Sequence, residues 1–250
     1  MSIPYSLFPI PYSLFPIPYL MRILAIGDIH GHSIAFDTLI AAVKPRLEDV
    51  IVTLGDYVDR GPDSQGVINR LIALHETGQL LALRGNHELM MLRSRHCAED
   101  KARWHQSGGK ETLASYSKSG KSQRKRIPDE HWHFIENVCV DWWESDEHFF
   151  VHANAAPHLS LNEQSEYNLF WERFNNPLPH FSGKTMVCGH TSQKSGKPVN
   201  IGHAICIDTR IYDEGWLTCL EVDSGKVWQA NKKGKLRTAS IDDFQILELL

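Results

Sequence analysis

Three short apolar runs in this chain each end in a segment that carries aspartate, histidine or asparagine beside glycine. The runs are 22–26, 50–54 and 80–83, and the polar segments that follow them are 27–31, 55–61 and 85–88. Such runs are typical of strands buried on both faces. Helical patterns at 33–43 and 66–74 separate them, which predicts a parallel α/β sheet. Because the carboxyl ends of parallel strands meet at one edge, we expect the three polar segments to lie together.

The polar residues of these segments have the chemistry of metal ligands. Asp28 and His30 alternate along the chain and therefore point the same way, while the two oxygens of Asp56 could bridge two cations. Asn86 offers a neutral oxygen. Two later histidines, His152 and His190, also follow apolar runs. Oxygen and imidazole ligands without a thiolate favour two divalent cations, with manganese, iron, zinc and magnesium as candidates. Such a pair activates water for attack on phosphorus.

The motifs Gly-Asp-Ile-His-Gly, Gly-Asp-Tyr-Val-Asp-Arg-Gly and Gly-Asn-His-Glu resemble those of the phosphoprotein phosphatase family of calcineurin-like metallophosphoesterases. The resemblance runs from about Met21 to Asp208, and 107–116 and 150–153 are similar to the small bacterial branch. It implies an α/β metallophosphoesterase fold, in which helices flank a central β-sandwich of mixed sheets. It also implies one domain at 21–250 with a partly helical cap insertion at about 91–148.

The resemblance further implies a role for each residue of the site. Asp28, His30 and Asp56 would hold one metal ion. Asp56, Asn86, His152 and His190 would hold the other. His87 would protonate the leaving oxygen, with its ring oriented by Asp59, and Arg60 and Arg173 would bind the phosphoryl oxygens. General chemistry agrees, because planar guanidinium groups suit phosphoryl oxygens and a histidine beside the metals can supply a proton.

Each of these residues also has a simpler interpretation. Aspartate and asparagine after strands commonly cap helices. His152 and His190 could be ordinary core histidines, and Arg173 could be a surface cation. The occurrence of five such residues in three glycine-bracketed segments, Asp28, His30, Asp56, Asn86 and His87, favours the site.

The expected activity is hydrolysis of phosphomonoesters by a serine/threonine-type protein phosphatase, with two divalent ions, manganese first among them. The alternatives are symmetrical hydrolysis of dinucleoside tetraphosphates or other nucleotides, a phosphodiesterase and a non-catalytic binding module. His30 and the Asp59–Arg60 pair favour the first activity, and Glu88 stands where diesterases have aspartate. No expected ligand is missing. Asn154 and Arg210 stand where the family usually has glycine, and this bears on substrate preference.

Composition restricts the partners. The 250 residues carry a net charge of −4, which argues against a general nucleic-acid or membrane-surface binder. The resemblance implies that the partner is a phosphorylated protein or a small phosphoester. Five cysteines without a Cys-x-x-Cys pair indicate reduced thiols and a cytoplasmic location. No apolar run reaches membrane-spanning length.

The first twenty residues differ from the rest. Residues 3–9 are repeated at 10–16, and a third copy begins at Ile17. The DNA unit TTCCCTA, repeated and translated, reproduces this segment, so we expect 1–20 to be translated repetitive DNA that lies outside the fold, and Met21 to be the natural start. A signal peptide is disfavoured by the prolines and by the absence of a basic start.

The rest of the chain predicts a helical cap and then short strands. Helices are expected at 99–106 and 129–138, and strands at 149–152, 185–188, 204–208, 217–222 and 226–229. The last two strands would form a hairpin through 223–225. We expect 118–126 and 231–237 to be polar loops, Trp142-Trp143 to pack in the core or cap, and a short helix to dock from Ile241.

Overall fold

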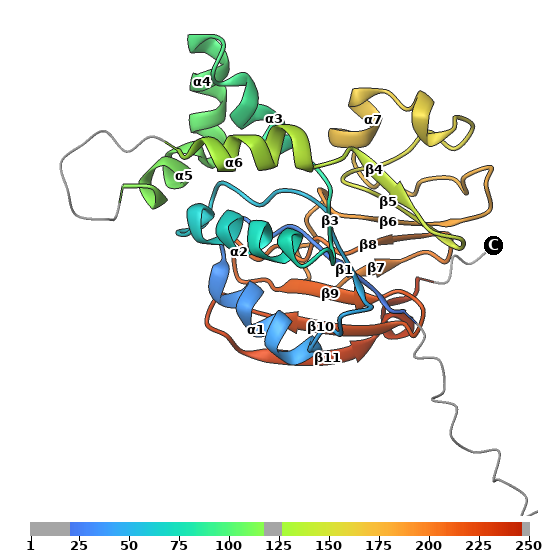
Figure 1. Cartoon of the computed structure of the whole chain (residues 1–250). Coiled ribbons are helices and arrows are strands. Elements are labelled where there is room, and N and C mark those ends of the chain that lie inside the picture. The colour runs from blue at the N-terminus through green and yellow to red at the C-terminus, as the bar shows by residue number, and fades with distance from the viewer. Residues whose placement is uncertain (1–20, 118–126, 247–250) are drawn as a thin grey trace, which may run out of the picture.

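Two β-sheets pack against each other at the centre of the molecule, and helices cover their outer faces (Figure 1). This computed structural model describes residues 21–117 and 127–246. The repeat at 1–20 and the cationic segment 118–126 therefore lie outside the described residues. The strand orders are β11-β10-β9-β1-β2-β3 and β4-β5-β6-β8-β7. Parallel and antiparallel pairs occur in both sheets, which confirms the predicted fold class.

The first sheet begins with the predicted alternation of strands and helices. Its elements are β1 (Ile23–Ile26), α1 (Ser33–Val43), β2 (Val50–Thr53), α2 (Ser64–Glu76) and β3 (Leu80–Ala82), with the three strands parallel. The predicted hairpin then adds β9 (Leu217–Glu221) and β10 (Lys226–Ala230) in antiparallel register. The sequence did not predict β11 (Leu236–Ser240), which pairs with β10 at the sheet edge and overlaps the polar segment 231–237.

The second sheet contains the later strands of the chain. They are β4 (Trp142–Glu144), β5 (His148–Val151), β6 (Thr185–Cys188), β7 (Val199–Asn200) and β8 (Ala204–Cys206). Of these, β4 and β7 were not predicted. Trp143 lies in β4 and stacks on Phe150, with ring centroids 5.3 Å apart. The helical elements in this later part of the chain are η3 (Leu161–Glu163), α7 (Glu166–Phe170) and η4 (Ile241–Phe244). The last is a 3-10 helix at the position predicted for a docking helix.

Alternation along each strand explains why both of its faces are apolar. In β1, Ile23 and Ala25 belong to the core between the sheets, whereas Leu24 and Ile26 belong to the core under the helices. Phe150 of β5 joins the core between the sheets, and its neighbour Phe149 packs on the other face. Because successive side chains point to opposite faces, a continuous apolar run satisfies both layers.

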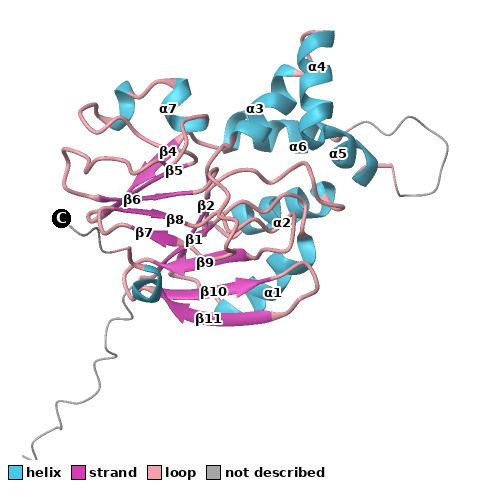
Figure 2. Ribbon diagram, turned by 180° about the vertical axis from the view of Figure 1, so that it is seen from behind, coloured by secondary structure: helices cyan, strands magenta, loops and turns pink. Residues whose placement is uncertain are grey.

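Helices after β3 form a cap beside the two sheets. They are α3 (Asn86–Arg93), α4 (Ala98–Trp104), η1 (His105–Gly109), α5 (Lys110–Ser115), α6 (Asp129–His133) and η2 (Phe134–Val138), with η1 and η2 in π-helical geometry. Figure 2 shows α3 to α6 projecting together past the edge of the sheets. The helices expected at 99–106 and 129–138 are present, and the expected cap range of 91–148 also includes β4. Among the described helices, none has the length and apolar character needed to cross a bilayer.

Candidate metal centre

The loops that follow strands of both sheets meet at one edge, and they bring the six predicted metal ligands together. Asp28 and His30 follow β1, Asp56 follows β2, and Asn86 begins α3 after β3. From the second sheet, His152 follows β5 directly and His190 follows β6. All of these side chains are buried except that of His190, which is half-buried.

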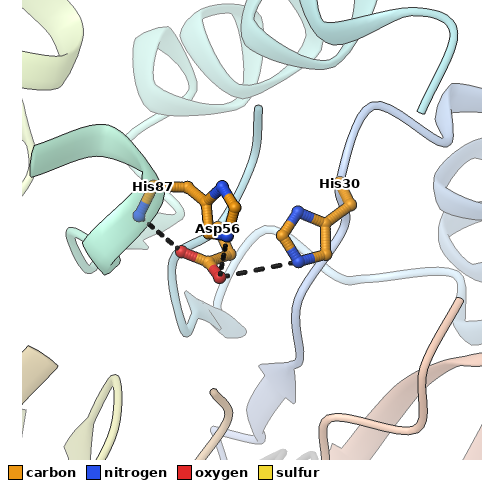
Figure 3. Close-up of side chains that lie close together, drawn as sticks. All are labelled: His30, Asp56 and His87. Carbon is orange, nitrogen blue, oxygen red and sulfur yellow. Dashed lines mark hydrogen bonds and ion pairs between the residues drawn. The ribbon is translucent and has the colours of Figure 1, made fainter. Parts of the chain in front are cut away.

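The Asp56 carboxylate is the centre of this group. Its Oδ2 lies 3.5 Å from Nε2 of His30, and its Oδ1 lies 3.5 Å from Nε2 of His152. Figure 3 shows the carboxylate between His30 and His87, whose backbone N–H donates to Oδ1 at 3.0 Å. Two clusters have ligand atoms within 4.8 Å of one another, one of His30, Asp56 and His87 and the other of Asp28, Asp56 and His152. Asp56 belongs to both clusters, as a bridging ligand would.

The clusters divide the residues differently from the ligand sets that the resemblance implied. Asp28 lies with His152 rather than with His30, and His87 lies with His30. Both sets nevertheless share Asp56, so the bridging position is the same in the two descriptions.

The histidines offer unprotonated nitrogens to the centre of the site. Nδ1 of His152 donates to the carbonyl of Leu54 at 2.7 Å, and Nε2 of His190 donates to the carbonyl of Trp171 at 3.2 Å. The opposite nitrogens face Oδ1 of Asn86 at 3.0 and 3.3 Å. Because each ring proton is on the other side, three lone pairs converge here with no hydrogen between them. A cation satisfies such a donor set, and the carbonyl partners fix the ring tautomers.

The first cluster has the same arrangement. Nδ1 of His30 donates to the carbonyl of Val58 at 2.9 Å, which leaves Nε2 directed at Asp56. Burial lowers the pKa of His30, and burial together with His152 lowers the pKa of His190 to about 4. Both rings are therefore neutral at pH 7, the form in which imidazole binds metals.

The carboxylates of the site respond to opposite influences. Burial opposes ionisation of Asp56, but His87 holds its pKa below its ordinary value. Burial and the charges of Asp208 and Asp56 raise the pKa of Asp28. The backbone N–H of His190, at 3.1 Å, is the donor to Asp28 among the described residues. A divalent cation would supply the missing positive charge, so the residues present fit a pair of metal ions.

Asp59 and His87 form the pair that the resemblance implied. Nδ1 of His87 lies 2.6 Å from Oδ2 of Asp59, which is fully buried. Two cap residues also bind this carboxylate, since Trp104 donates from Nε1 at 3.0 Å and Thr112 donates from its hydroxyl at 2.7 Å. Burial alone would lower the pKa of His87, but Asp56 and Asp59 raise it above its ordinary value. Nε2 is the ring nitrogen that faces the centre, 3.8 Å from Oδ2 of Asp56.

The Arg60 side chain contacts two histidines of the site, His30 and His87. Its guanidinium contacts Nε2 of His30 at 2.9 Å and Nε2 of His87 at 3.0 Å, and it stacks on the Tyr212 ring at 4.3 Å. Arg173 is exposed and lines the same cavity as Asp56 and Arg60, with a volume of about 460 Å³. Both predicted arginines therefore lie on the wall of the site.

Sequence reasoning assigned no role to several residues that build the site. Glu88 is fully buried, and its carboxylate accepts the backbone N–H groups of Asp56 at 2.8 Å and Gly85 at 2.9 Å. It thus ties the loop after β2 to the start of α3. Burial raises its pKa to about 7. Its position three residues after the Gly85 N-cap was a usable signal, because this is where a capping acid stands.

The loops after β6 and β8 contribute further residues that were not predicted. Lys194, Arg210 and Tyr212 line the cavity with Arg60 and Arg173. Asn154, the other departure from the family pattern, donates from Nδ2 to the carbonyl of Arg173 at 3.3 Å. Nε2 of His203 instead donates to the carbonyl of Pro177 at 2.7 Å.

Unfavourable backbone conformations concentrate at this site. Five predicted site residues have left-handed φ angles: His30 (45°), Asp56 (52°), Asp59 (71°), Arg60 (66°) and His190 (61°). A left-handed conformation costs a residue with a side chain roughly 1–2 kcal/mol. Such conformations persist where the surrounding structure enforces them, commonly at functional sites.

Comparison with known proteins gives matches to phosphoesterases. A family model described as calcineurin-like phosphoesterase matches residues 21–195. A symmetrical bis(5'-nucleosyl)-tetraphosphatase of Acidovorax sp. (strain JS42) is 40% identical over 74 residues, covering 29% of this chain and 25% of that protein. Serine/threonine-protein phosphatase 1 of Salmonella typhimurium is 36% identical over 93 residues, covering 35% of this chain and 39% of that protein. The matches thus span less than half of either relative.

Solved structures show the same fold. The cold-active protein-tyrosine phosphatase of a psychrophilic Shewanella species superimposes with a TM-score of 0.56 and 18% identity. The superposition covers 87% of this chain and 80% of that one. At this identity the likeness establishes the architecture of two mixed sheets with flanking helices.

Proposed function

Because this chain belongs to the calcineurin-like phosphoesterase family, we propose that it is a metal-dependent phosphomonoester hydrolase of the serine/threonine protein phosphatase type. The observation that carries this proposal is the Asp56 carboxylate, whose two oxygens face His30 and His152 on opposite sides. Two divalent ions held there, manganese first among the candidates, would acidify water and draw electron density from the phosphoryl oxygens.

The side chains around the metal centre have separate tasks in this proposal. Arg60 and Arg173 bind the equatorial oxygens of the phosphoryl group, where charge gathers in the transition state. His87 donates its proton from Nε2 to the leaving oxygen, because its Nδ1 is occupied by Asp59. Asp59 keeps the ring in that orientation and stabilises its charged form.

A second candidate is symmetrical hydrolysis of dinucleoside tetraphosphates or a related cleavage of nucleotide anhydrides. Its support is the cavity wall, which carries four cationic side chains, Arg60, Arg173, Lys194 and Arg210, and a single carboxylate. That excess of positive charge suits a substrate with more than one phosphate. The 40% identity to a tetraphosphatase points in the same direction.

The test compares substrates with and without metal. With Mn²⁺, the protein should hydrolyse para-nitrophenyl phosphate, and EDTA should abolish the activity until metal is restored. His87→Asn should keep the bound metal, measured by elemental analysis, and lose turnover, whereas His203→Asn should resemble the wild type. Activity that survives complete metal removal would contradict the proposal. Rates on a phosphopeptide and on a dinucleoside tetraphosphate, measured side by side, separate the two candidates.

A further inference from the structure

Arg210 adopts a conformation that its side chain disfavours. Eight described residues other than glycine have positive φ, and five of them are the predicted site residues named above. Of the others, Lys44 is the C-cap of α1, and Asn176 is a residue type that tolerates this region. The last is Arg210, with φ of 63°, in the loop after β8. It therefore shares its backbone conformation with the residues of the metal centre.

The strained loop presents Arg210 to the cavity that contains Asp56. Its Nε donates to Asp213 at 3.1 Å, and its guanidinium lies 5.5 Å from the Tyr212 ring. The same ring also contacts Arg60, whose guanidinium lies 4.3 Å from the Tyr212 centroid. The Tyr212 hydroxyl is tied to Ser192 at 2.8 Å. Tyr212 thus connects the phosphoryl-binding arginine to Arg210 through a fixed ring.

Lys194 completes a cationic edge to the cavity. It extends from the loop after β6, it is exposed, and it makes no hydrogen bond or ion pair with any described residue through its ammonium group. Lys194 and Arg210 also line an adjoining pocket of about 230 Å³, so they stand at the outer edge of the site. The acids of that pocket are paired, Asp213 with Arg210 and Glu214 with Lys232.

We propose that Arg210 and Lys194 form a second anion subsite, which binds a phosphate group next to the one that is hydrolysed. Arg60 and Arg173 suffice for the three oxygens of a single phosphoryl group. Arg210 contacts Asp213 through Nε, so its two other guanidinium nitrogens and the Lys194 ammonium remain for a further anion. Phosphates joined through one bridging oxygen place their charges close together, and Arg60 and Arg210 both lie beside the Tyr212 ring, at 4.3 and 5.5 Å. The inference rests on the proposed metal-dependent hydrolysis and favours, for the same site, the second candidate substrate class, which carries more than one phosphate.

The primary test measures binding, so it does not depend on turnover. Inorganic pyrophosphate and inorganic phosphate are titrated calorimetrically into the metal-loaded protein at constant free Mn²⁺. The wild type should bind pyrophosphate at least about tenfold more tightly than phosphate, the effect of one or two charge-assisted hydrogen bonds. Arg210→Gly and Lys194→Ala should each reduce this ratio about three- to tenfold. Lys197→Ala, which removes an exposed cation from the same loop as Lys194, should preserve it.

The choice of variants keeps the test independent of folding. Glycine accepts a positive φ without strain, so Arg210→Gly should not unfold the loop, and Lys194→Ala changes an exposed side chain. Equal wild-type affinity for the two anions, or an unchanged ratio in both variants, would overturn the subsite.

Further measurements separate the proposed subsite from the proposed function and from a site that binds a carboxylate. A wild type that hydrolyses para-nitrophenyl phosphate but shows no preference for pyrophosphate contradicts the subsite alone. A preference for pyrophosphate without hydrolysis of any phosphoester contradicts the proposed function alone. Phosphopeptides with Asp or Asn after the phosphothreonine should have equal KM values. If Arg210→Gly removes a preference for the Asp peptide instead, the subsite binds a carboxylate and the phosphate assignment is wrong.

Discussion

Replacing Trp104 by phenylalanine tests whether the cap supports proton donation by His87. The Trp104 indole N–H lies 3.0 Å from each oxygen of Asp59, and Asp59 in turn contacts Nδ1 of His87 at 2.6 Å. Phenylalanine keeps an aromatic ring under the cap but cannot donate. The Asp59 carboxylate then retains Thr112 and His87 as side-chain donors among the described residues.

The expected magnitude follows from burial. Asp59 is fully buried and Trp104 is 2% exposed, so the lost bond is a charge-assisted one in a site screened from solvent. Losing such a bond costs about 1.5–3 kcal/mol, and the smaller ring leaves a void that adds roughly 1 kcal/mol. We therefore expect the free energy of unfolding to fall by about 2.5–4 kcal/mol. Thr112→Val, which removes a donor to the same carboxylate, should have a comparable effect, and Thr112→Ser should restore most of it.

The assay uses leaving groups that differ in their need for a proton. Phenyl phosphate leaves as a basic phenoxide and needs general-acid help, whereas 2,4-dinitrophenyl phosphate does not. Trp104→Phe should lower kcat about tenfold on the first ester and less than about twofold on the second, which is part of the roughly 10²–10⁴-fold that general-acid catalysis contributes. Trp132→Phe is the matched control, since Trp132 lies in α6 of the cap and stacks on Arg95.

Equal losses on the two esters, with metal content preserved, would refute the reasoning. Such a result would show that Trp104 supports the fold of the site in general and not the Asp59–His87 pair. An unchanged kcat on both esters would show that the indole donor is dispensable.

Three other substitutions probe the site and its support. His87→Asn should lose about 10²–10⁴ in turnover on phenyl phosphate while keeping bound metal, and an unchanged rate would remove His87 from proton donation. Asp49→Asn should lower the free energy of unfolding by roughly 2–3 kcal/mol at pH 7, because the buried Asp49 accepts hydrogen bonds from Arg22 and from the backbone of Arg46. Burial opposes ionisation of Asp49, but these bonds hold its pKa below the ordinary value, so the stability is present above about pH 4 and lost as pH falls below it. Denaturant unfolding of both proteins between pH 3 and 7 checks this, and a difference that stays constant across the range would contradict it. Gly61→Ala should abolish folding or cost several kcal/mol, because a Cβ there would lie 1.9 Å from the carbonyl oxygen of His30. Gly202→Ala, whose Cβ would meet no described residue within 4 Å apart from its chain neighbours, should cost only about 1 kcal/mol for its positive φ. Similar melting temperatures for the two variants would contradict the packing argument.

The strands that end in the site were predictable because their sequences satisfy two layers at once. Residues 23–26 and, apart from Thr53, residues 50–54 are apolar, so these runs indicate strands buried on both faces whatever the tertiary fold. By contrast, β11 (Leu236–Ser240) pairs on one side only and carries Arg237 and Thr238, so its composition did not distinguish it from a loop. The two-residue strand β7 (Val199–Asn200) is too short to produce any periodic signal.

The ligands were predictable by residue type, but their surroundings were not. The contacts of Trp104 and Thr112 with Asp59 join residues 45 and 53 positions apart, and they depend on how the cap packs. No periodicity encodes such a pairing. Arg210 was visible in the sequence only as a departure from a glycine, whereas its place on the cavity wall follows from the position of the loop after β8. Contacts between loops that are distant in the sequence therefore could not be predicted from the sequence alone.

The metal centre draws on both sheets, and this has a consequence for how the protein comes apart. Asp28, Asp56 and Asn86 follow strands of the first sheet, whereas His152 and His190 follow strands of the second. Any motion that separates the two sheets would move these ligands apart, so bound ions would link the two sheets. Chelation should then lower the melting temperature of the entire sandwich rather than loosen a local loop, because ion release and layer separation become one thermodynamic event.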